Sequence, residues 1–85
     1  MLTYQTILYK AEFLGSELGW QLNKDDVIWS SQKYNTAAPA IQEFDFSEPP
    51  HNNWFVTMVE REGDEVKDEE IFDSSVIEGY DGSPL

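Results

Sequence analysis

The first part of the chain repeats its apolar side chains at a spacing that favours a helix. Between residues 3 and 18 they recur every three or four positions, which is the period of one helix face. They are Tyr4, Ile7, Leu8, Ala11, Leu14 and Leu18. Thr3 can serve as an N-cap, and Gly19 stands where a left-handed C-cap is expected. The pattern therefore predicts an amphipathic helix over residues 3–18.

After Gly19 the pattern changes to one that is typical of extended chain. Residues 20–22 and 27–34 mix aromatic and β-branched side chains with polar ones around a turn at 23–26, which indicates strands. In residues 40–46, Phe44 and Phe46 alternate with Glu43 and Asp45, as in a half-buried strand. Residues 54–62 begin apolar at odd and even positions alike, so we expect a central strand there.

The segment after residue 62 admits two interpretations. The sequence Glu62-Gly63-Asp64-Glu65 has the composition of a turn, and residues 66–72 then run back as the second strand of a hairpin. The alternative makes residues 64–72 helical, because Glu, Lys and Asp tolerate helices. We favour the hairpin.

These elements predict an α+β fold, in which an N-terminal amphipathic helix packs on an antiparallel sheet of about four strands. The 85 residues are enough for one domain and not for two. We expect a single compact domain over residues 1–78. Residues 79–85 contain two Gly and one Pro and should form a flexible tail.

Composition removes several classes of function. The chain has 17 acids, 5 bases and a net charge of −12, so it cannot neutralise the phosphates of a nucleic acid or an anionic membrane. Its aromatic fraction of 14% is too high for a disordered acidic chain. It has no Cys, so it can form neither a thiolate zinc site nor a cysteine nucleophile, and it has a single His, His51. We therefore expect no enzyme activity, no cofactor and no metal site.

Two features of the sequence bear on where in the cell the protein is expected. Strictly apolar runs such as Trp54-Phe55-Val56 are far short of the roughly 20 residues that span a bilayer. The first residues lack the basic and apolar regions of a secretion signal. These observations predict a soluble, cytoplasmic protein, and the strong self-repulsion predicts a monomer.

The negative charge is concentrated in the second half of the chain. Residues 1–42 hold 4 acids and 3 bases, whereas residues 43–85 hold 13 acids and 2 bases. Alternate side chains on a strand share a face about 6.6–7 Å apart, similar to neighbouring phosphates of one DNA strand. We expect an anionic array that binds a partner protein. Its predicted residues are Glu43, Asp45, Glu60, Glu62, Asp64, Glu65, Asp68, Glu69 and Glu70.

In size, charge and expected element order the chain resembles small acidic inhibitor proteins. Phage-encoded DNA mimics that block restriction, CRISPR or repair enzymes are one such group, and immunity proteins that neutralise nuclease toxins are another. The resemblance implies an inhibitor that occupies the nucleic-acid-binding surface of an enzyme, with a basic protein as its partner. Two alternatives stay open: an immunity protein or antitoxin, and an adaptor subunit that binds through its apolar face.

Overall fold

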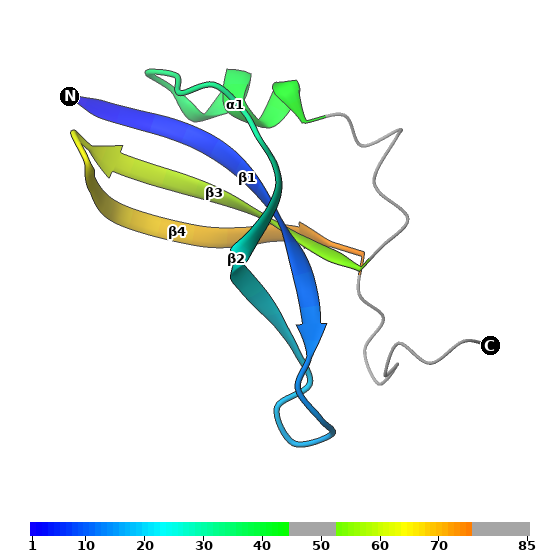
Figure 1. Ribbon diagram of the computed structural model, residues 1–85. Coiled ribbons are helices and arrows are strands. Elements are labelled where there is room, and N and C mark those ends of the chain that lie inside the picture. The colour runs from blue at the N-terminus through cyan, green and yellow to red at the C-terminus, as the bar shows by residue number, and fades with distance from the viewer. Residues whose placement is uncertain (45–52, 76–85) are drawn as a thin grey trace.

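The structure, a computed structural model, describes residues 1–44 and 53–75. The described residues form an antiparallel sheet with one short helix against it (Figure 1). In chain order the elements are β1 (Leu2–Phe13), β2 (Trp20–Ser30), α1 (Ala37–Glu43), β3 (Trp54–Glu62) and β4 (Glu65–Ser74). The four strands lie in the order β2-β1-β3-β4, so β1 and β3 are central and β2 and β4 are the edges.

The predicted helix over residues 3–18 is wrong, because most of this segment is the central strand β1. Four consecutive side chains of β1, residues 6–9, are buried, since the sheet has both of its faces covered at this point. A strand buried on both faces does not need to alternate apolar and polar positions. Leu14 and Leu18, which the helix would have buried, lie exposed in the loop before β2.

The two glycines of this loop explain why the segment looked like a capped helix. Gly15 and Gly19 have φ angles of +103° and +67°, and the Gly19 N–H donates to the Gly15 carbonyl oxygen at 2.7 Å. The left-handed conformation expected of Gly19 is therefore present, but it turns a β-hairpin.

The α+β class is likewise wrong. The described fold is mostly antiparallel sheet, and its helix α1 has 7 residues and follows two strands. Residues 40–43, expected in a strand, belong to α1, where three alanines favour helix. Asp45 and Phe46 lie outside the described residues, as do the expected tail and His51. Among the described residues no helix has the length and apolar character needed to cross a membrane.

The hairpin prediction for the later strands is confirmed. β3 pairs with β1 on one side and with β4 on the other, and Gly63 adopts a φ of +60° in the turn between β3 and β4. The pairing of β3 with β4 slips twice, which leaves Lys67 and Phe72 as extra residues of bulges in the edge strand. By contrast, β2 runs through residues 23–26, where a turn was expected, and its register with β1 is irregular there.

Helix α1 covers one face of the sheet. The Thr6 hydroxyl of β1 donates to the Ala40 carbonyl oxygen of α1 at 2.7 Å, with both residues completely buried. Beside this bond, Phe44 packs its ring against Trp54 and Trp29 at centroid distances of 5.8 Å. Each aromatic buried in this way removes on the order of 150–250 Å² from water, so this cluster is the main core.

The opposite face is covered by the sheet itself. Ile7, Tyr9 and Val59 are buried there, although α1 lies on the other side. In a flat sheet the edge strands β2 and β4 would be about 14 Å apart, because two strands lie between them. Yet Lys24 Nζ on β2 lies 2.5 Å from Glu69 Oε1 on β4. The sheet must therefore curl towards this face, which is its concave side.

The strand assignment of residues 2–13 predicts opposite outcomes for two leucines that a helix would treat alike. Leu8→Ala should lower the free energy of unfolding by about 2–5 kcal/mol, because Leu8 is 2% exposed in the core. Leu18→Ala should change it by less than about 0.5 kcal/mol, because Leu18 is 63% exposed. Urea unfolding of both variants measures the difference, and similar losses at the two positions would contradict the fold.

Candidate functional site

The β3–β4 hairpin carries acidic side chains on the face that also holds α1. Glu60 lies opposite Asp68, and Glu62 lies opposite Glu65. Residues directly opposite one another in an antiparallel pair share a face, as do alternate residues along a strand. Six carboxylates meet on this side, which we name the acidic hairpin face. They are Glu60, Glu62, Glu65, Asp68, Glu70 and Asp73.

Few contacts neutralise the acidic hairpin face. Lys67 Nζ lies 3.3 Å from a Glu65 oxygen and 3.9 Å from a Glu62 oxygen, and all three side chains are well exposed. Such surface pairs contribute little because water screens them. Glu60 accepts a hydrogen bond from the Tyr4 hydroxyl at 3.0 Å, and this bond raises the pKa of Tyr4. The face therefore presents several carboxylates to solvent.

Three of the nine residues predicted for the array lie elsewhere, and a fourth is outside the described residues. Glu43 ends α1 and accepts hydrogen bonds from the Tyr34 hydroxyl at 2.6 Å and the Gln32 N–H at 3.1 Å. The hydrogen bond that Tyr34 donates to Glu43 raises the pKa of Tyr34. Asp64 lies in the turn after β3, and Asp45 is outside the described residues. Glu69 belongs to the concave side of the sheet, as its contact with Lys24 requires.

Asp73 is a member of the face that the sequence pattern did not reveal. Counting alternate residues from Asp68 and Glu70 leads to Phe72, which is apolar. The bulge at Phe72 shifts the alternation by one residue and places Asp73 opposite Val56, on the acidic side. A bulge of this kind has no signature in the sequence.

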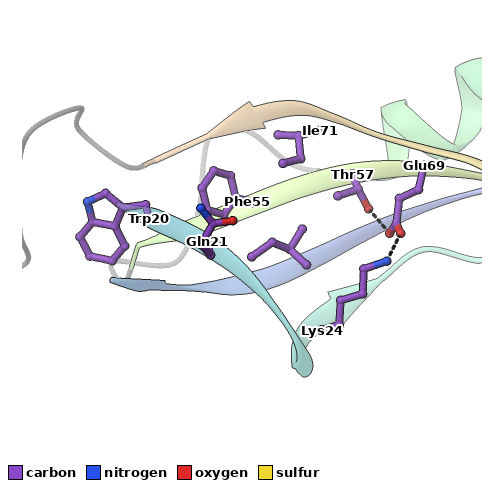
Figure 2. Close-up of a pocket in the computed structure, with 8 residues that line it drawn as sticks. Trp20, Gln21, Lys24, Phe55, Thr57, Glu69 and Ile71 are labelled. Carbon is purple, nitrogen blue, oxygen red and sulfur yellow. Dashed lines mark hydrogen bonds and ion pairs between the residues drawn. The ribbon is translucent and has the colours of Figure 1, made fainter. Parts of the chain in front are cut away.

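So small a domain has little room for a pocket, yet the concave side contains one of about 350 Å³. Figure 2 shows its side chains converging from β2, β3 and β4. Trp20 lies at one end, and the ion pair of Lys24 with Glu69 lies at the other. The lining residues are Trp20, Gln21, Leu22, Lys24, Phe55, Thr57, Glu69 and Ile71. We name this site the concave pocket.

Glu69 supplies the carboxylate of the concave pocket and is tightly held. Its side chain is 17% exposed, and it accepts hydrogen bonds from Lys24 at 2.5 Å and from the Thr57 and Tyr9 hydroxyls at 3.2 Å each. Burial alone would raise its pKa, but the bonds from Lys24, Thr57 and Tyr9 outweigh burial and hold the pKa of Glu69 below its usual range. For Tyr9, burial and the nearby Glu69 raise the pKa. Glu69 is therefore ionised at neutral pH.

The described part of the chain offers two surfaces of different chemistry. No group of three or more His, Asp or Glu side chains within residues 1–44 and 53–75 is arranged to hold a metal ion. The concave pocket offers an apolar wall, one carboxylate and one exposed ammonium group, whereas the acidic hairpin face offers a surface of negative charge. No family model matches the chain, and no curated protein or solved structure matches it.

The lowered pKa of Glu69 predicts a pH-dependent contribution to stability. Because the folded pKa lies below the unfolded value of about 4.3, the contribution is complete above that value and is lost as the pH falls through the folded pKa. Glu69→Gln should therefore lower the melting temperature at pH 7 by more than it does at pH 2.5.

Comparing each variant with the wild type at the same pH removes the general effect of the other acids. Glu70→Gln, on the neighbouring exposed position, provides the matched control and should show no such loss. If the loss of melting temperature caused by Glu69→Gln stays constant or grows as the pH falls, the stabilising role of the Glu69 contacts is contradicted.

Proposed function

We propose that the protein is a stoichiometric inhibitor that binds the nucleic-acid-binding surface of a DNA- or RNA-processing enzyme as a mimic of the phosphate backbone. The observation that carries the proposal is the gathering of six carboxylates on the acidic hairpin face. Basic side chains of the partner would pair with these carboxylates in place of phosphates. Inhibitors of restriction, CRISPR and repair enzymes and immunity proteins against nuclease toxins both fall within this class.

The spacing of the acidic hairpin face supports the proposal. Alternate carboxylates along β3, such as Glu60 and Glu62, are separated by about 6.6–7 Å. Their partners Asp68 and Glu65 on β4 lie about 4.5–5.5 Å across the pair. Phosphates of one DNA strand recur at a similar distance. A channel lined with Arg and Lys for a phosphate backbone can therefore meet several of these groups at once.

The energetic penalty of the arrangement also supports a binding role. Glu60 faces Asp68 and Glu62 faces Glu65, and like charges directly opposite one another destabilise a sheet. A small domain has only about 5–15 kcal/mol of stability in total. Charges that served solubility alone could be dispersed over the surface with less repulsion. A cationic partner would relieve the repulsion on binding.

The same charges predict how association proceeds. A surface of this sign attracts a basic partner over distances of several ångströms and accelerates encounter at low salt. Most of the binding free energy should come from the few carboxylates that are fully desolvated in the complex. Binding should therefore be fast and should weaken steeply with salt.

The proposal predicts that four neutral substitutions on the acidic hairpin face abolish most partner binding. The variant combines Glu60→Gln, Glu62→Gln, Asp68→Asn and Glu70→Gln. Loss of one desolvated charge pair costs about 2–5 kcal/mol, so affinity should fall by tenfold or more. Proteins of a cell lysate are captured on the immobilised protein and eluted with duplex DNA or RNA. The affinity of each eluted enzyme for the wild type and for the variant is then measured.

A matched variant separates position from total charge. Glu12→Gln, Glu17→Gln, Asp25→Asn and Asp26→Asn remove four exposed acids near the β1–β2 hairpin, and this variant should keep its affinity. Binding should also disappear in 1 M salt, where screening acts within about 3 Å. Equal losses in the two variants, or a partner that nucleic acid does not displace, would refute the proposal.

A further inference from the structure

The concave pocket lies on the side of the sheet that does not carry the acidic hairpin face. Glu69 points into it from β4, whereas the adjacent Asp68 and Glu70 point to the other face. Its walls are apolar side chains from three strands, with Trp20 and Leu22 on β2, Phe55 on β3 and Ile71 on β4. The pocket is therefore a second site, built from residues that the proposed inhibitor function does not use.

The two charged groups of the pocket differ in how firmly they are held. The Glu69 side chain is 17% exposed and is fixed by the Thr57 and Tyr9 hydroxyls as well as by Lys24. The Lys24 side chain is 67% exposed, and its ammonium group is solvated easily when it leaves Glu69. Lys24 is thus the exchangeable member of the ion pair and Glu69 the fixed one.

This asymmetry selects the charge of a ligand. A cationic group that replaces the Lys24 ammonium group finds Glu69 already desolvated and oriented, and Lys24 moves into water. An anionic group that pairs with Lys24 would approach Glu69 closely and would enter the field of a chain with a net charge of −12. Arg61, a cation on β3, is not part of the pocket lining. Its Nη1 donates to Gln5 Oε1 at 2.6 Å.

The apolar part of the pocket selects the body of the ligand. Trp20 and Phe55 present aromatic surface, and Leu22 and Ile71 present aliphatic surface, along the hollow that leads to Glu69 (Figure 2). Burying an apolar body there is favourable by roughly 25 cal/mol per Å². Aromatic faces also attract cations. The hollow of about 350 Å³ suits a small molecule or a single side chain.

The geometry points to the concave pocket as a binding site for an organic cation, an ammonium or guanidinium group on an apolar body that pairs with Glu69 in place of Lys24. The apolar body lies against Trp20, Phe55 and Ile71. The site is independent of the proposed inhibitor function, because its residues lie on the other side of the sheet.

A series of indole compounds tests the charge preference by NMR titration of the whole chain. Tryptamine is cationic, tryptophol is neutral and indole-3-propionate is anionic, while their aromatic bodies are alike. Tryptamine should bind most tightly and should shift signals of Trp20, Phe55 and Thr57. A blocked tripeptide with a central arginine tests whether a protein side chain can supply the cation. Binding of the tripeptide would support a protein side chain as the source, and binding of tryptamine alone would support a small molecule.

Three variants assign the binding to Glu69. Glu69→Gln should weaken tryptamine binding by about tenfold or more, because it removes a charge-assisted hydrogen bond. Lys24→Met, at an exposed position, should strengthen it several-fold, because the competing ammonium group is gone. Glu70→Gln removes the same charge from the other face and should leave the affinity within twofold.

The Lys24→Met result keeps the test decisive if Glu69→Gln does not fold. The inference is overturned if neither tryptamine nor the tripeptide binds at millimolar concentration, or if indole-3-propionate binds more tightly than tryptamine. It is also overturned if Lys24→Met fails to increase the affinity, or if Glu69→Gln and Glu70→Gln weaken binding equally.

Discussion

The curl of the sheet is the constraint on which both surfaces of the molecule depend. The ion pair between Lys24 and Glu69 joins the two edge strands across the two central ones, which requires the sheet to curl. Curling covers Tyr9 and Val59 on the side that lacks the helix and creates the concave pocket. It also leaves the opposite side of the β3–β4 hairpin convex and exposed to solvent. The curl therefore connects the packing of a small core with the display of its charges.

The strand period keeps the two surfaces chemically distinct. Asp68, Glu69 and Glu70 follow one another on β4, yet Glu69 serves the concave pocket and its neighbours serve the acidic hairpin face. A slip of one residue in the pairing of β3 with β4 would exchange them. It would leave Glu69 without Thr57 and would bury two carboxylates that have no partner there. The register of this hairpin is thus constrained by charge as well as by apolar contacts.

The sequence allowed the β3–β4 hairpin to be predicted, because Gly63 marks its turn and both faces of β3 begin apolar. It did not allow β1 to be predicted, since a strand buried on both sides loses the alternation that identifies strands. Much of the acidic face could be inferred from alternate spacing, but Asp73 depends on a bulge. The concave pocket could not be inferred, because it joins Lys24 to a residue 45 positions away through the curl of the sheet.

The most direct test of this account is a through-space NMR measurement between the side chains of Lys24 and Glu69. With the ammonium nitrogen 2.5 Å from the carboxylate oxygen, the ε protons of Lys24 and the γ protons of Glu69 should give nuclear Overhauser cross-peaks. A flatter sheet would hold the two edge strands about 14 Å apart and would give none. Cross-peaks between these protons are the result that the curled sheet predicts. Their absence, with Lys24 showing contacts only within β2 and to β1, would contradict it.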